Sequence, residues 1–314
     1  MHGCQLKRLN RPKWFPPHRE IPYRSQAMAS LRQFFRDGVD RWFPAWGQVY
    51  RDYRDERAAS IPIDTPFGFK IAIPPTAMVG EWFANQLRSG AYETDEIALL
   101  TALIDEAEVF IDIGANIGWY ACLAATRGKR VLAFEPLPSN LRFLLRNLGY
   151  NGLEQVELYP LALGAEPRLM KMYGGGPAAS FFSGWHGASA ARFTLVPVTT
   201  LDTIAGRRFA GVRLAIKLHV EGFEYEVLRG AAATLDLDPK PSWLVENHFS
   251  PKFTGIVNKR FLDVFELWEH GYDAHTGDAE RRPISPDDVR RWVSKGAVDL
   301  GSINYLFTPR ASHG

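Results

Sequence analysis

The sequence predicts an α/β protein built on a Rossmann-like, doubly wound and mostly parallel sheet of seven strands. Three observations support this fold class. Apolar segments of strand length alternate with segments of helical periodicity from residue 109 onward. A turn with glycines at both ends follows the first apolar segment, and polar residues follow several others, where parallel sheets bind ligands. With 46% hydrophobic residues among 314, the chain can fill the core of one large domain.

The expected elements follow in chain order. Residues 61–75 predict two short strands around a turn at 66–68, and residues 76–104 predict helix with a break near Gly90. Later strands are expected at 109–113, 130–136, 156–163, 168–173, 193–198, 214–220, 243–248 and 303–307, and helices at 138–149, 225–235 and 261–270. We therefore divide the chain into an N-terminal extension (1–60), a cap or approach segment (61–108) and the main domain (109–314).

The N-terminal extension differs from the rest of the chain in composition. Residues 1–57 carry twelve Lys or Arg against six Asp or Glu, with interleaved aromatic residues at Trp14, Phe15, Trp42, Phe43 and Trp46. Such a mixture can dock on anionic surfaces. Because no amphipathic repeat is sustained, we favour an arm that packs its aromatic residues on the main domain or on a second copy of the chain. Two helices are expected in it, at 23–36 and 48–59.

Composition argues against several classes of protein. A net charge of +2 does not by itself indicate a nucleic-acid partner. Cys4 and Cys122 are too few for a disulfide framework, and Cys122 is expected to be buried on a helix. The sequence contains no run of eighteen apolar residues and no apolar segment after its basic start. We therefore expect a cytoplasmic protein without a transmembrane segment.

The turn after residues 109–113 carries the first functional signal. Gly114 and Gly118 remove side chains that would block a ligand, and the following helix points free N–H groups at the same place. A dinucleotide fingerprint needs further glycines where this chain has Asn116 and Trp119. The turn therefore argues against NAD and FAD and favours an adenosyl ligand without a pyrophosphate.

An acid on the next strand identifies that ligand more closely. Glu135 ends the apolar segment after the turn, about twenty residues on, which is where a ribose-binding carboxylate is expected. Asp112 and the turn would then face an amino-acid moiety. This combination predicts S-adenosylmethionine as the cofactor, with Asp112, Gly114, Asn116, Gly118 and Glu135 on its side of the site.

Four blocks of the chain resemble the FkbM-type methyltransferases. They are FIDIGANIGWY, AFEPLPSN, VTTLD and IKLHVEGFEYEVLRGA, and the similarity covers roughly residues 92–246. The resemblance implies a class I methyltransferase fold and O-methylation of a hydroxyl on a sugar or other small polar metabolite. It also implies that Glu93 lies close to the cofactor. The family usually has aspartate at the position of His219.

His219 is the proposed base. Methyl transfer requires chiefly a positioned acceptor and a route for its proton, and histidine is the side chain best matched to neutral pH. His219 lies at the carboxyl end of an expected strand, so we predict that it is the base or orients the acceptor, with Glu221 or Glu246 holding its ring. Alternatively, His219 only fills the position of the family's aspartate and hydrogen-bonds a loop.

Other residues near these strands have simpler predicted uses. His219, Glu221, Glu246 and His248 could form a metal site, but their spacing matches no known ligand motif, and no metal is expected. Lys217 is expected to pair with a buried acid, and Gly222 to open a helix.

The segment 174–190 is rich in glycine and serine. This composition suits either a mobile lid over the site or a disordered surface loop. Ser180, within this segment, is counted among the cofactor-side residues.

Two other functions remain open at this point. One is a nucleotide-cofactor oxidoreductase on the same sheet, which the residues of the glycine turn oppose. The other is a non-catalytic binding protein that kept the fold, and histidine at position 219 is the only feature that supports it.

Overall fold

The structure is a computed structural model that describes residues 62–74, 80–249, 254–300 and 302–311. The N-terminal extension and its two expected helices lie outside these residues. Within them, the central sheet has eight strands. Their order is β12 (Pro283–Ile284), β11 (Tyr272–Thr276), β13 (Asn304–Pro309), β10 (Ser242–Glu246), β9 (Leu214–Leu218), β3 (Val109–Ile113), β4 (Arg130–Phe134) and β5 (Glu157–Tyr159).

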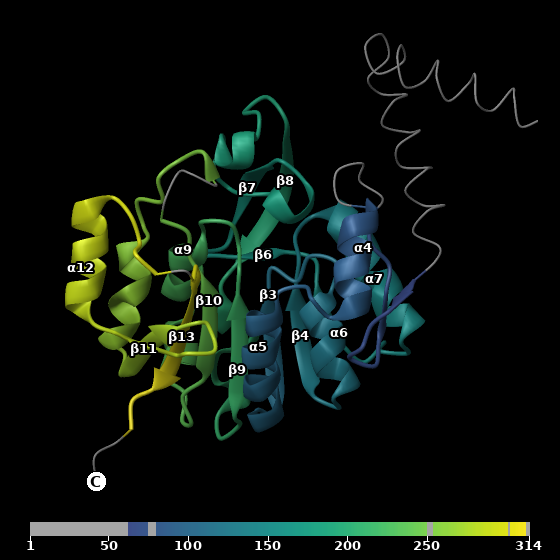
Figure 1. The fold of residues 1–314 in the computed structure, drawn as a ribbon, viewed down its shortest axis with the longest axis horizontal. Helices are drawn as coiled ribbons and strands as arrows, with labels where there is room; N and C mark the ends of the chain where they lie inside the picture. Colours follow the sequence, from purple (N-terminus) through teal and green to yellow (C-terminus); the bar gives the residue numbers. More distant parts are fainter. Residues whose placement is uncertain (1–61, 75–79, 250–253, 301, 312–314) are drawn as a thin grey trace, which may run out of the picture. The chain divides into compact units, whose positions relative to one another are not determined.

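The direction of the strands confirms a doubly wound, mostly parallel sheet (Figure 1). All neighbours from β10 to β5 pair in parallel, whereas β13 is antiparallel to both β10 and β11. The chain runs outward from β3 to β5 and then crosses back to β9 on the other side of β3. This reversal is a topological switch point, where sheets of this class bind ligands. The sequence predicted seven strands, and two of the eight observed, β11 and the two-residue edge strand β12, lie outside every predicted strand segment.

The prediction of one strand over residues 156–163 was wrong, because this segment forms two separate strands. Residues 156–163 divide at Pro160 into β5, in the central sheet, and β6 (Ala162–Leu163). Proline has no N–H to donate to a ladder, so the strand ends there. β6 instead pairs with β8 (Phe193–Thr199), which also pairs with β7 (Arg168–Tyr173). This three-stranded sheet lies beyond the carboxyl edge of the central sheet, above β3 in Figure 1.

Helices cover both faces of the central sheet because its strands are apolar on both sides. Successive side chains of β3 point to opposite faces, so Phe110 packs in one apolar cluster and Ile111 in the other. The first cluster includes residues of the hairpin β1 (Ile63–Asp64) and β2 (Lys70–Ile71), and of α4 (Gly80–Ser89), α5 (Thr94–Glu106), α6 (Trp119–Thr126) and α7 (Pro138–Tyr150). The second includes residues of α8 (Leu201–Ile204), η4 (Gly206–Phe209), α9 (Glu224–Arg229), α10 (Ala232–Leu235), η5 (Leu262–Trp268) and α12 (Pro286–Lys295).

Segment 61–108 shares its core with the main domain. Ile71, Leu87 and Leu100 are fully buried in the same apolar cluster as residues of α6 and α7. The predicted hairpin and the helical break near Gly90 are both confirmed. Cys122 is fully buried on α6, as expected. In the described part of the chain, no helix has the length and apolar character needed to cross a membrane.

Asn147 on α7 joins the hairpin to the glycine turn. Its fully buried side chain accepts a hydrogen bond from the Ala72 N–H at 2.7 Å and donates to the carbonyls of Ala72 at 3.0 Å and Ile117 at 2.8 Å. Because buried backbone groups need partners, this one amide satisfies groups that neither the hairpin nor the turn can satisfy alone.

Asn147→Ala is expected to lower the free energy of unfolding by about 3 kcal/mol. Three buried hydrogen bonds are lost at roughly 1 kcal/mol each, and their backbone partners stay unsatisfied. Urea unfolding measures the loss. The matched control is Asn85→Ala, which removes an exposed amide on α4 and is expected to cost less than about 0.5 kcal/mol. Equal stability of the two variants would contradict the linking role of Asn147.

Candidate active site

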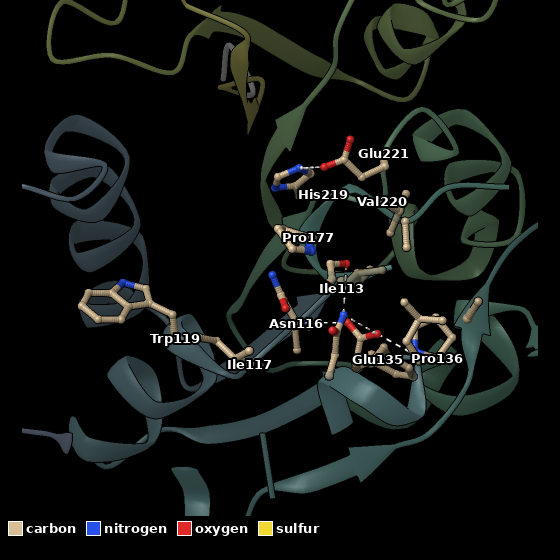
Figure 2. Close-up of a pocket in the computed structure, with 18 of the residues that line it drawn as sticks. Ile113, Asn116, Ile117, Trp119, Glu135, Pro136, Pro177, His219, Val220 and Glu221 are labelled. Carbon is tan, nitrogen blue, oxygen red and sulfur yellow. Dashed lines mark hydrogen bonds and ion pairs between the residues drawn. The ribbon is translucent and has the colours of Figure 1, made fainter. Parts of the chain in front are cut away.

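A cavity of about 360 Å³ lies at the carboxyl ends of β3, β4 and β9. Glu135 and the pair His219–Glu221 lie on opposite sides of Ile113 in Figure 2. Gly176 and Pro177 of η2 (Gly176–Ala178) also line the cavity. The site is therefore at the switch point of the sheet and is covered by part of segment 174–190.

The glycine turn allows β3 and β9 to meet at the cavity. The His219 N–H donates to the Ile113 carbonyl at 3.0 Å, and a Cβ built at Gly114 would lie 1.9 Å from the His219 carbonyl oxygen. Gly114 also has a φ of 83°, which L side chains rarely adopt. Gly118 has a different task, because it does not line the cavity and a Cβ there would meet Leu144 of α7 at 3.0 Å.

Glu135, the predicted ribose-binding acid, follows β4 at the cavity. Its buried carboxylate lines the cavity, accepts the Asn116 N–H at 2.8 Å and the Leu137 N–H at 2.9 Å, and accepts the Asn140 side-chain amide at 3.2 Å. Burial raises the pKa of Glu135 to about 7, against the effect of these donors. The structure therefore brings Asn116 and Glu135 together, as the sequence predicted.

Asp112 does not contact the cavity directly. It is fully buried below the lining residues, and its carboxylate lies 3.9 Å from the Lys217 ammonium on β9. Burial raises the pKa of Asp112, and Lys217 acts in the opposite direction. The prediction that Lys217 pairs with a buried acid is thus confirmed. Lys217 does line the cavity, so Asp112 acts on the site by its interaction with the Lys217 ammonium.

His219 is held between two carboxylates. Its Nδ1 lies 2.9 Å from Glu246 and its Nε2 lies 3.1 Å from Glu221. Burial disfavours the charged ring, but the two glutamates outweigh burial and raise the pKa of His219 well above its ordinary value. His219 is therefore an imidazolium at neutral pH, with both ring N–H groups donating. It has no lone pair free to accept a proton from a substrate.

The two glutamates that flank His219 each accept a further hydrogen bond. Glu246 accepts His248 Nε2 at 2.8 Å, and Glu221 accepts the Trp185 indole N–H at 2.7 Å. Burial opposes their ionisation, yet the facing imidazoles lower the pKa values of both glutamates. In the described residues, no group of three or more His, Cys, Asp or Glu side chains has an arrangement that could hold a metal ion.

Segment 174–190 is tied to Glu221. Trp185, at the start of η3 (Trp185–Gly187), is 1% exposed, and its ring would collide with a Cβ at Gly222 at 2.7 Å. Ser180 is not a lining residue; its hydroxyl donates to the Glu221 carbonyl at 2.7 Å. Glu221 itself has a φ of 56°, a strained conformation for a non-glycine residue. The segment therefore positions Glu221 and does not place Ser180 against a ligand.

Glu93, which the family resemblance implied to be close to the cofactor, is a lining residue of the cavity. Its carboxylate lines the cavity and accepts the Tyr120 hydroxyl at 2.6 Å, and its backbone has a φ of 41°. Sequence reasoning did not single out Tyr120 or Lys217 as lining residues. Tyr120 could have been predicted as a lining residue, because it follows Gly118 by two residues in the first turn of the helix after the glycine turn. Lys217 could have been found two residues before His219, because the two share a strand face.

Comparison with known proteins gives a match to a family. The methyltransferase FkbM domain matches residues 112–274. The hexuronic acid methyltransferase AglP of Haloferax volcanii is 29% identical over 155 residues, which are 49% of this chain and 61% of AglP. The chain thus spans less than two thirds of that relative.

Two solved structures are also similar. A precorrin-6y C5,15-methyltransferase from Geobacter metallireducens GS-15 has 15% identity over 56% of this chain and 70% of its own, with a TM-score of 0.33. An rRNA methylase from Streptococcus thermophilus has 12% identity over 67% and 90%, with a TM-score of 0.34. We draw no conclusion from these two structures, because both TM-scores are below 0.5.

We predict that His219 carries protons on both ring nitrogens from pH 6 to pH 8. Because its folded pKa is raised, its stabilising pairs persist through the ordinary histidine range and are lost only as pH rises through the higher folded value. Nitrogen-15 NMR of the imidazole measures this state. Glu246→Gln should lower the pKa of His219, while Glu166→Gln on the surface should not. A wild-type ring that titrates near pH 6.5 would contradict the doubly paired arrangement.

Proposed function

The chain belongs to the FkbM methyltransferase family, and from this premise we propose that it transfers a methyl group to a hydroxyl oxygen of a sugar or other small polar metabolite. The cofactor is S-adenosylmethionine, as predicted. The observation that carries the proposal is Glu135, a buried carboxylate at the end of β4 that faces the cavity and fixes the Asn116 amide. Such a carboxylate can accept both hydroxyls of a ribose.

The residues of the cavity fit an adenosyl cofactor. Glu135 would hold the ribose, and the apolar side chains of Leu137, Leu161 and Leu163 would enclose the adenine. Gly114 lines the cavity, and the absence of a Cβ there lets the backbone of His219 approach the turn after β3. When bound, the cofactor supplies an activated methyl group on a good leaving group, so that the protein's own task is to orient the acceptor and remove its proton.

Glu221 is the proposed proton acceptor. Its carboxylate lines the cavity, whereas both ring nitrogens of His219 are already engaged by glutamates. A hydroxyl oxygen becomes strongly acidic as it is methylated, so even a carboxylate of low pKa can take the proton. Glu221 would take the hydroxyl proton as the acceptor oxygen gains the methyl group that the bound cofactor would supply. His219 then acts as the residue that orients Glu221.

The acceptor class rests on the relative and on the chemistry of the lining. AglP is named as a hexuronic acid methyltransferase, which supports a sugar as the acceptor. Glu93, Glu221 and His219 line the cavity and offer the polar groups that a sugar requires.

Affinity for S-adenosylhomocysteine is expected to rise about tenfold between pH 6 and pH 8. Ribose hydroxyls donate to the ionised form of Glu135, and its pKa of about 7 leaves most of the carboxyl protonated at pH 6. Isothermal titration calorimetry in matched buffers measures the change. Glu135→Gln should bind weakly and without this slope.

Glu224→Gln is the matched control for that experiment. Burial also raises the pKa of Glu224 to about 7, but Glu224 does not line the cavity. Its variant should therefore keep the slope of the wild type. Wild-type affinity that is equal at pH 6 and pH 8 would argue against Glu135 as the ribose acid.

Glu221→Gln is expected to lower the methylation rate by roughly 10²–10⁴-fold and to change the Kd of S-adenosylhomocysteine by less than about threefold, because it removes a proton acceptor and leaves the ribose site intact. Mass spectrometry of hexuronic acids and neutral hexoses incubated with S-adenosylmethionine identifies the methylated product. Glu166→Gln, an exposed glutamate, serves as the control. A Glu221→Gln enzyme with full turnover would exclude the proton-accepting role.

A further inference from the structure

Lys217 and Asp112 form a buried ion pair that is incomplete. The two residues are direct neighbours on β9 and β3, and their side chains are only 6% and 1% exposed. The ammonium lies 3.9 Å from the nearest carboxylate oxygen, too far for a hydrogen bond. No hydrogen bond of the Lys217 ammonium is found within the described residues, and no side chain there donates a hydrogen bond to the Asp112 carboxylate, which faces only the Ala121 N–H. Buried charges without such partners are rare and call for an explanation.

Lys217 is directed to the cavity. It is the only Lys or Arg among the described residues that line this cavity, and its ammonium lies 5.1 Å from the centre of the Tyr120 ring. The Tyr120 hydroxyl in turn donates to Glu93, another lining residue. A cation and a carboxylate thus flank one aromatic side chain. An α-amino acid group carries the complementary pair of charges, a carboxylate and an ammonium.

The position of Lys217 in the sheet matches the reach of the cofactor. Glu135 ends β4 and Lys217 lies on β9, with β3 between these strands. Two strand spacings separate them, roughly 10 Å. A ligand that places its ribose on Glu135 and passes over Gly114 therefore brings the far end of its amino-acid chain toward Lys217.

We propose that Lys217 binds the α-carboxylate of the cofactor's methionine moiety, with Glu93 facing the α-ammonium. This inference rests on the proposed function, because it concerns the same cofactor. The ligand carboxylate supplies the acceptor that the Lys217 ammonium lacks, in a site where charge-assisted hydrogen bonds are strong. Asp112 has the role of holding the ammonium in place from below. The protein thereby distinguishes complete adenosyl amino acids from shorter adenosyl thioethers.

The test compares three ligands by isothermal titration calorimetry. They are S-adenosylhomocysteine, its decarboxylated analogue, and 5′-methylthioadenosine, which lacks the whole amino-acid group. The wild type should bind S-adenosylhomocysteine roughly 10–100-fold more tightly than the decarboxylated analogue, as expected for one hydrogen-bonded charge pair. In Lys217→Met this ratio should fall to about one, while binding of 5′-methylthioadenosine is retained. That retained binding shows that the adenosine end is still folded.

A second variant covers the case in which Lys217→Met leaves Asp112 buried without a partner and does not fold. The double variant Asp112→Asn with Lys217→Met removes both charges and should show the same loss of discrimination. A ratio near one in the wild type, or a full ratio in either folded variant, overturns the inference and leaves the proposed function standing. Failure of the wild type to bind any of the three ligands overturns both.

Discussion

The contact between the turn after β3 and the backbone after β9 is the constraint on which the site depends. The Ile113 carbonyl accepts the His219 N–H, and Gly114 leaves no room for a side chain beside the His219 carbonyl. This contact extends the pairing of the two central strands by one residue beyond their ladder. It holds Glu135, on one side of β3, and His219, on the other, at fixed positions around one cavity. A side chain at Gly114 would separate the cofactor half of the site from its acid–base half.

Around that contact, partly buried charges of opposite sign alternate. His219 lies between Glu221 and Glu246, and Glu246 lies between His219 and His248. Buried ion pairs contribute little net stability, since desolvation offsets their attraction, so the alternation serves chiefly to orient the side chains. It also decides which group can accept a proton. An imidazole that is hydrogen-bonded to two carboxylates stays protonated, so it cannot accept a further proton. Glu221, whose carboxylate lines the cavity, is then the group that can accept the proton of the substrate.

Segment 174–190, which lies outside the central sheet, helps to position Glu221. Its composition left open whether it forms a lid or a disordered surface loop. The structure shows that Trp185 is buried and donates to Glu221, while Pro177 lines the cavity. Glycine and serine content within the segment could not reveal this, because Glu221 and Gly222, which contact Trp185, lie more than thirty residues further along the chain. The division of the predicted strand 156–163 into two could have been predicted from the sequence, because Pro160 lies at the break.

The sequence by itself determined the strand–turn–helix after Val109, the acid at Glu135 and the alternation of strands with helices, because each depends on local periodicity or on spacing along the chain. It also predicted that His219 would have carboxylates beside its ring. Only the tertiary structure decided that both Glu221 and Glu246 hold that ring, which makes it a cation. The charge of a partly buried group depends on every neighbour within a few ångströms, and one of these neighbours, Glu246, comes from the adjacent strand β10, which local sequence reasoning cannot place.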